Sequence, residues 1–135
     1  MDRKTFDELK NHTNTKFEFN RENILEKSMS LFSSYSYYHD LFIEELKILK
    51  TMKHDRDKLY GILYADLRRG PLDMRHKTEI EPHIFSNENY YRMSLKITDQ
   101  ETIVKYLEDV LDFIKKSSFH ISNIVSLIKM ERGIE

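Results

Sequence analysis

The sequence predicts an all-α protein, and three of its features carry that prediction. Glycine and proline are scarce, at 3 and 2 of the 135 residues, which disfavours the many turns of a sheet protein. Apolar residues recur every three, four or seven positions over two long stretches, as they do on one face of a helix. Gly70–Pro71 is a stop signal for the first stretch, and the capping box Thr98–Glu101 is expected to begin the second.

The periodicity places the expected helices in order along the chain. A short helix is expected over about residues 3–11, followed by a connector rich in Asn and Thr, which compete for helical hydrogen bonds. Asn20 is a suitable N-cap for a long central helix that continues to Arg69. The chain length predicts a single helical domain. Its parts are N-terminal and basic central helices over 1–70, an irregular connector over 71–98, and C-terminal oligomerisation helices over 99–133.

Two serines interrupt the apolar pattern of the C-terminal stretch. Ser117 and Ser118 fall where its two apolar series, with steps of three and four, call for an apolar residue. Either one helix carries a small polar layer here, or the helix stops near Lys116 and a serine caps the next helix. We predict a break, because serine is a better cap than a helix-interior residue.

The same stretch is apolar on more than one side. In a small chain, such a helix is expected to bury its excess apolar face against copies of itself. The residues expected to carry this self-association are Ile103, Leu107, Leu111, Ile114, Phe119, Ile121, Ile124 and Ile128.

A group of aromatic residues lies near the beginning of the central helix. Phe32, Tyr35, Tyr38 and Phe42 follow helical spacing on one face and are expected to lie in the core. Tyr37 is the member of the group that this face leaves outside.

Several kinds of chemistry lack the residues they need. Cysteine is absent, which excludes disulfides, thiolate zinc sites and a cysteine nucleophile, and the three glycines are too far apart for a phosphate-binding loop. The six histidines show no metal-ligand spacing, and the pairs Glu44/Glu45 and Asp109/Asp112 are expected on solvated helical faces. We therefore expect no enzyme, no catalytic residues, no cofactor and no metal. No apolar window is long enough for a membrane span, and the first residues do not resemble a secretory signal.

Charge is segregated along the chain although the net charge is only −1. Residues 47–77 hold nine Lys and Arg against four Asp and Glu, so this segment is basic and the segments on both sides are acidic. Basic side chains interleaved with aromatic rings suit single-stranded nucleic acid, because cations neutralise phosphates and rings stack on bases. The alternative is that this segment forms a solvated charged face and that Tyr60 and Tyr64 lie in the core. The candidate DNA-binding residues are Lys50, Lys53, Arg56, Lys58, Tyr60, Tyr64, Arg68 and Arg69.

The C-terminal stretch "IVKYLEDVLDFIKKSSFHISNIVSLIKMERG" resembles the UvsY-like recombination mediators of T4-like bacteriophages. The resemblance covers about residues 40–133, including the central "EELKILKTMKHDRDKLYGILYADLRRG". The positions that match the family pattern are Lys58, Tyr106, Leu107, Ser118, Phe119, Ile121, Asn123, Ile124 and Gly133. Departures from the pattern are Ser117 and Ser122 in place of basic residues, Tyr60 in place of a cation, and Met130 in place of an aromatic residue.

The resemblance implies a function and partners. UvsY-like proteins bind single-stranded DNA, form a homo-oligomeric ring, and help to load a phage RecA-like recombinase onto DNA covered by single-strand-binding protein. The resemblance also implies that the protein forms a hexamer or heptamer and is located in the cytoplasm of the infected bacterial host. The alternative is a non-enzymatic helical adaptor or structural protein that self-associates and binds protein partners without nucleic acid.

Overall fold

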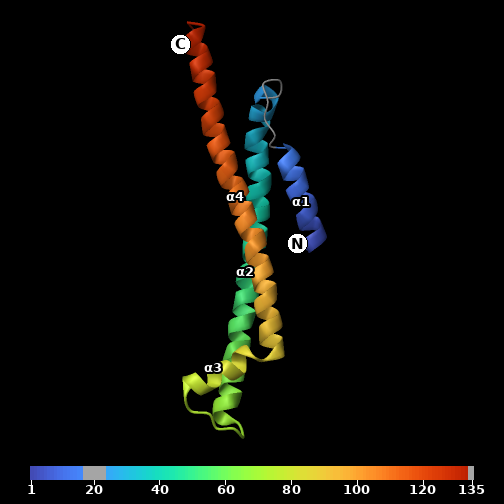
Figure 1. Ribbon diagram of the computed structural model, residues 1–135, viewed down its shortest axis with the longest axis vertical. Helices are drawn as coiled ribbons and strands as arrows, with labels where there is room; N and C mark the ends of the chain where they lie inside the picture. Colours follow the sequence, from blue (N-terminus) through green and yellow to red (C-terminus); the bar gives the residue numbers. More distant parts are fainter. Residues whose placement is uncertain (17–23, 134–135) are drawn as a thin grey trace. The chain divides into compact units, whose positions relative to one another are not determined.

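The computed structural model describes residues 1–16 and 24–133, and over these residues the chain is helical without any strand. The four helices are α1 (Arg3–Lys16), α2 (Ile24–Arg69), α3 (Lys77–Phe85) and α4 (Glu88–Glu131), as Figure 1 shows. The all-α prediction is confirmed. The predicted N-cap Asn20 lies outside the described residues.

The helices contribute to two compact units, which are described one at a time. The first unit combines residues 1–43 with 105–135, and the second comprises residues 44–104. Because α2 and α4 are long, each contributes one part to the first unit and another to the second. The single-domain organisation stays a prediction.

In the first unit, α1 contacts both long helices. The hydroxyls of Thr13 and Tyr38 share a hydrogen bond of 2.7 Å, and Tyr38 is fully buried. The ring of Phe6 meets Tyr106 edge to face, with 5.3 Å between the ring centroids. α1 therefore continues five residues beyond the predicted end at residue 11, since Thr13 gains a buried partner in this way.

In the second unit, α2 and α4 run antiparallel. Gln100 Nε2 on α4 donates to the carbonyl oxygen of Glu45 at 2.9 Å and to its Oε2 at 2.7 Å. Further along, the rings of Tyr60 and Tyr90 lie 6.4 Å apart. The solvated position predicted for Glu45 is wrong, because only 6% of this residue is exposed.

The prediction of an irregular connector over 71–98 is also wrong. Only residues 71–76 and 86–87 in this region are non-helical. α3 forms despite Pro82 in its interior, since it fully buries Ile80 and Ile84 one turn apart. Apolar burial therefore outweighs the local cost of proline.

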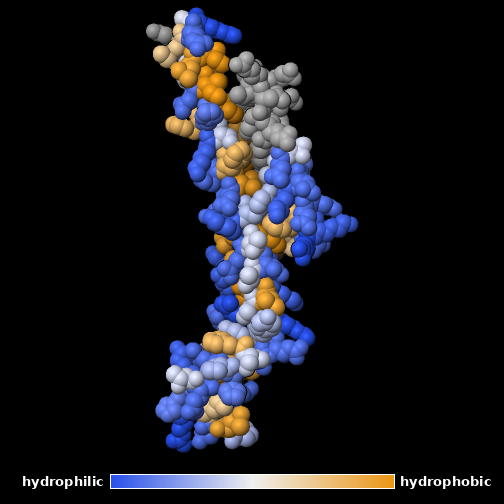
Figure 2. Space-filling view, viewed as in Figure 1, coloured by the Kyte–Doolittle hydropathy of each residue, from blue (hydrophilic) through white to orange (hydrophobic). Residues whose placement is uncertain are grey.

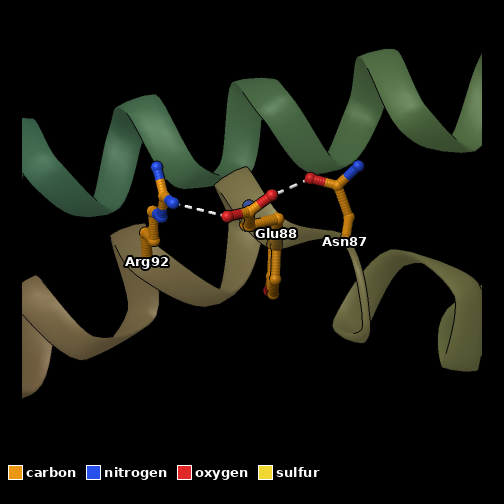
Figure 3. A network of polar contacts seen from close by, with 4 residues as sticks. Asn87, Glu88 and Arg92 are labelled. Atoms are coloured by element: carbon orange, nitrogen blue, oxygen red, sulfur yellow. Dashed lines mark hydrogen bonds and ion pairs between the residues drawn. The ribbon is translucent and has the colours of Figure 1, made fainter.

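α4 begins earlier than the sequence predicts. Asn87 caps it, because its Oδ1 accepts a hydrogen bond from the backbone N–H of Tyr90 at 3.1 Å. Glu88 and Arg92 form an ion pair across the first turn (Figure 3). The capping box predicted at Thr98 is therefore wrong: Thr98 lies inside α4, where its hydroxyl donates to the carbonyl of Ser94.

α4 also passes through Ser117 and Ser118 without the predicted break. A serine in a helix interior costs only a few tenths of a kcal/mol relative to alanine, less than the hydrogen bonds that a break would sacrifice. The i, i+4 ion pair between Lys116 and Asp112, at 2.8 Å, further supports the helix just before the serines.

The stop signal after α2 is confirmed. The helix ends at Arg69, and the N–H of Gly70 donates to the carbonyl of Asp66 at 2.8 Å. The N–H of Met74 in turn donates a hydrogen bond to the carbonyl of Leu67. The left-handed conformation falls on Asp73, with φ of 40°, and not on the glycine.

The aromatic face of α2 is only partly in the core. Tyr38 is fully buried and Tyr35 and Phe42 are half-buried, whereas 82% of Phe32 is exposed, so its predicted core position is wrong. Tyr37 is exposed, as predicted.

Candidate nucleic-acid interface

The candidate DNA-binding residues all lie on the part of α2 that belongs to the second unit. Their side chains differ in accessibility. The exposed members are Lys50, Lys53, Lys58, Arg68 and Arg69, and the half-buried members are Arg56, Tyr60 and Tyr64.

Most of these residues share one face of α2. At 3.6 residues per turn, a sector of about 80° holds five of them. They are Lys50, Lys53, Tyr60, Tyr64 and Arg68. Lys58 and Arg69 are three turns apart but share the adjoining flank, about 80–100° from Lys50. The helix therefore presents cations at both ends of a central pair of aromatic rings.

Arg56 stands apart from this group. Its Nε lies 3.9 Å from Asp57 Oδ1, and this nitrogen is buried without a hydrogen-bond partner. Only 28% of its side chain is accessible, so Arg56 offers less of its charge to a ligand than its exposed neighbours do.

Tyr60 and Tyr64 stack on one another one turn apart, with ring centroids 6.0 Å apart and planes inclined by 29°. The hydroxyl of Tyr60 donates to Glu81 Oε1 on α3 at 3.0 Å. Burial, and then the hydrogen bond and the charge of Glu81, raise the pKa of Tyr60 above its usual value. Tyr60 is thus a fixed, neutral ring at ordinary pH.

A hollow of about 530 Å³ opens beside these rings. Gly61 and Ala65, the residues with the smallest side chains around it, leave room between the tyrosines and the arginines at the end of α2. The lining residues are Tyr60, Gly61, Tyr64, Ala65, Arg68, Arg69 and Lys77. Sequence reasoning missed Lys77, which comes from α3, although it is the last cation of the basic segment.

The residues predicted to carry self-association fall into two groups. Ile103, Leu107, Leu111 and Ile114 are buried within the chain itself, at 7% exposure or less. Ile121 and Ile124 are half-buried, whereas Phe119 and Ile128 are 71% and 42% exposed. Beyond Ile114 no described residue is buried, and Figure 2 shows hydrophobic side chains gathered near the end of α4. Among these eight residues, the apolar surface left for another molecule thus lies after Ile114.

Within residues 1–16 and 24–133, no three His, Asp or Glu side chains come together as metal ligands would. None of the described helices is long and apolar enough to cross a membrane.

The fold and this surface define a class of protein: an all-α chain that displays a basic helix with stacked tyrosines. The family model described as "Recombination, repair and ssDNA binding protein UvsY" matches residues 11–134, and the chain belongs to this family.

Two solved structures share the fold. Both are crystal structures of the recombination mediator protein UvsY of bacteriophage T4, in different lattices. The lattice II structure has a TM-score of 0.77 and 13% identity, and the match covers 93% of this chain and 96% of the other. The lattice I structure has a TM-score of 0.74 and 14% identity, with coverages of 92% and 98%. No curated protein sequence matches the chain.

Proposed function

We propose that this protein is a recombination mediator. It binds single-stranded DNA and promotes the loading of a phage RecA-like recombinase onto DNA covered by single-strand-binding protein, in the cytoplasm of the infected bacterial host. The observation that carries the proposal is the face of α2 on which exposed cations flank the stacked pair Tyr60 and Tyr64. Membership of a family of recombination, repair and single-stranded-DNA-binding proteins supports it.

The exposed cations bind the phosphates of the strand and release counterions, which provides affinity without sequence preference. Tyr60 and Tyr64 offer rings on which any base stacks. Arg56 contributes less, because only 28% of its side chain is accessible. The protein itself breaks no bond in this mechanism, and it needs no catalytic residue, cofactor or metal.

One basic helix binds a strand weakly, so the proposal includes self-assembly. The exposed end of α4, with Phe119 and Ile128, provides an apolar surface for contacts between copies. A homo-oligomeric ring, a hexamer or a heptamer, displays several copies of the α2 face to one strand and multiplies its affinity. A strand wrapped on such a ring is deformed, which loosens the competing single-strand-binding protein.

Fluorescence anisotropy with a labelled single-stranded oligonucleotide tests DNA binding. Lys58→Ala and Arg68→Ala are each expected to weaken binding about fivefold, while Lys4→Ala, an exposed cation on α1, leaves it unchanged. Equal affinities for all three variants and the wild type would show that the face of α2 is not the binding surface.

The mediator role needs a separate assay. Recombinase assembly on DNA pre-covered with single-strand-binding protein is followed in time, with and without this protein. The protein is expected to shorten the delay before assembly, and Arg68→Ala is expected to restore part of that delay. An unchanged delay would contradict the mediator role even if DNA binding were observed.

The second candidate is a helical adaptor that binds only proteins. The exposed apolar end of α4 favours it, because such a surface suits a protein partner as well as a second copy. No binding to single-stranded DNA at low salt would favour the adaptor.

A further inference from the structure

We infer that the hollow beside Tyr60 and Tyr64 is a nucleotide subsite. In the absence of DNA, the carboxylate of Glu81 binds Lys77 in place of a backbone phosphate. Lys77 of α3 then exchanges this carboxylate for the phosphate. The inference deepens the proposed function and rests on it, since it assigns a ligand group to residues of α3 that the basic helix does not include.

The hollow has the chemistry of a single nucleotide. It is lined by the stacked rings of Tyr60 and Tyr64, which suit a base. It is also lined by three cations, Arg68, Arg69 and Lys77, which suit the phosphate. Its volume of about 530 Å³ is of the size that small-molecule ligands occupy in proteins.

In the free chain, Glu81 holds two groups that face this hollow. Its Oε1 accepts the hydroxyl proton of Tyr60 at 3.0 Å and lies 3.4 Å from Lys77 Nζ. Glu81 does not itself line the hollow, but its carboxylate binds a phenol and an ammonium group that could otherwise bind an anionic oxygen of the strand. Glu81 therefore binds these two groups in the free chain and competes with the phosphate for them.

The exchange is energetically easy. The Lys77–Glu81 pair is an i, i+4 pair on a surface helix, and 69% of the lysine side chain is exposed. Such pairs contribute little, because water screens them and the long side chains lose freedom. A phosphate held by Lys77, Arg68 and Arg69 together makes stronger, charge-assisted contacts. The negative charge of Glu81 opposes its arrival and limits the affinity.

Lys77→Ala tests the cation of α3. Anisotropy titrations at several salt concentrations are expected to show about fivefold weaker binding and a salt slope shallower by about 0.7, the value for one phosphate contact on a single strand. Lys96→Ala is the matched control, since Lys96 is an exposed lysine of the same unit that does not line the hollow. Equal behaviour of the two variants would overturn the inference.

Glu81→Gln tests the competitor, because glutamine keeps an acceptor for Tyr60 but removes the charge. It is expected to bind single-stranded DNA about threefold to fivefold more tightly than the wild type. Glu79→Gln removes the same charge from a more exposed position of α3 and is expected to have a smaller effect. Unchanged affinity for Glu81→Gln, or an equal gain for both variants, would overturn the inference.

The two failures are distinguishable. If the wild type binds DNA and Arg68→Ala weakens it, but Lys77 and Glu81 have no specific effect, the inference falls and the proposed function stands. If the wild type does not bind single-stranded DNA at low salt, both fall.

Discussion

Tyr38 illustrates how single side chains fix the first unit. It is fully buried, and its hydroxyl pairs with Thr13, whose own hydroxyl donates to the carbonyl of Leu9 at 2.8 Å. The phenol thereby links α2 to the backbone of α1. Sequence periodicity placed Tyr38 in the core correctly, but the partner on α1 depends on a contact between residues 25 positions apart.

Tyr38→Phe removes this link and leaves the ring. We expect the free energy of unfolding to fall by about 1 kcal/mol, the usual net contribution of one buried hydrogen bond. Thermal denaturation measures the change. Tyr37→Phe is the control, because Tyr37 is 52% exposed, and it is expected to unfold like the wild type.

Tyr38 also gives the stability a pH dependence. Burial raises the pKa of its phenol above the ordinary 10.0, so the folded state favours the protonated form. Its contribution is complete below pH about 10 and is lost as the pH rises through the folded-state pKa. Denaturant titrations at alkaline pH are expected to show a smaller decline for Tyr38→Phe than for the wild type. Identical declines would contradict this assignment.

Gln100 has the corresponding role in the second unit. Its amide donates twice to Glu45, from a position that is 4% exposed. Gln100→Ala is expected to lower the free energy of unfolding by about 2–3 kcal/mol, because the buried carboxylate and the backbone carbonyl of Glu45 each lose a hydrogen bond. Glu101→Ala, at an exposed position of the same helix, is the control in the same denaturation experiment. A loss no larger than that of the control would show that the pair does not stabilise the unit.

Residue patterns could not reveal that Lys77 lines the hollow, that Glu45 is buried, or that Arg56 is less accessible than its neighbours. The charge count includes Lys77 in the basic segment, but only the packing of α3 brings it to the tyrosines. Glu45 is a charged residue and was therefore expected in solvent, whereas its burial involves Gln100, 55 positions away. The exposed cations of α2 were easier to assign, because helical spacing alone determines which of them share a face.

At the scale of the elements, periodicity predicted the long helices well and their ends less well. The sustained three–four spacing gave α2 and its stop at Arg69, because Gly70 and Pro71 oppose continuation. The start of α4 was missed because Thr98–Glu101 fits the capping-box pattern, whereas the actual cap, Asn87, is followed three residues later by Tyr90 and not by Glu or Gln. The intervening residues are helical in the structure, with Ile97 almost fully buried. The serines led to a wrong prediction for a related reason. The free energy that favours serine at a cap is smaller than the free energy gained by continuing a long helix.

Gly61, inside α2, and Gly70, just past its last residue, allow a matched test of this helix. A Cβ added at Gly61 would meet nothing within 4 Å, so Gly61→Ala is expected to stabilise the protein by about 1 kcal/mol through helix propensity. A Cβ at Gly70 would lie 2.3 Å from the carbonyl oxygen of Asp66, so Gly70→Ala is expected to destabilise it. Melting temperatures measure both effects, and shifts of the same sign would contradict the described end of α2.

At the scale of the whole molecule, the basic segment and the apolar end of α4 have complementary roles. In the proposed function, the former binds the strand, and the latter increases the number of copies that bind it. The sequence predicted the charge segregation directly from counting. It could not separate the apolar residues of α4 that form the chain's own core from those left for assembly, because both follow the same spacing.

That division predicts different effects for two substitutions on α4. Phe119→Ser, at a position 71% exposed, is expected to reduce the assembled mass measured by light scattering while the helix content stays near that of the wild type. Leu107→Ser, at a fully buried position, is expected to lower the stability of the chain itself by several kcal/mol. An unchanged mass for Phe119→Ser, or a monomeric wild type, would contradict assembly through this end.

The most direct test of the account is the salt dependence of binding to single-stranded DNA. The logarithm of the affinity is expected to fall linearly with the logarithm of the salt concentration, by about 0.7 for each phosphate bound. A variant that combines Lys50→Ala, Lys53→Ala and Arg68→Ala is expected to bind weakly and with a much shallower slope. A wild-type affinity that does not change with salt, or a triple variant that binds as the wild type does, would contradict the assignment of the α2 face as the DNA-binding surface.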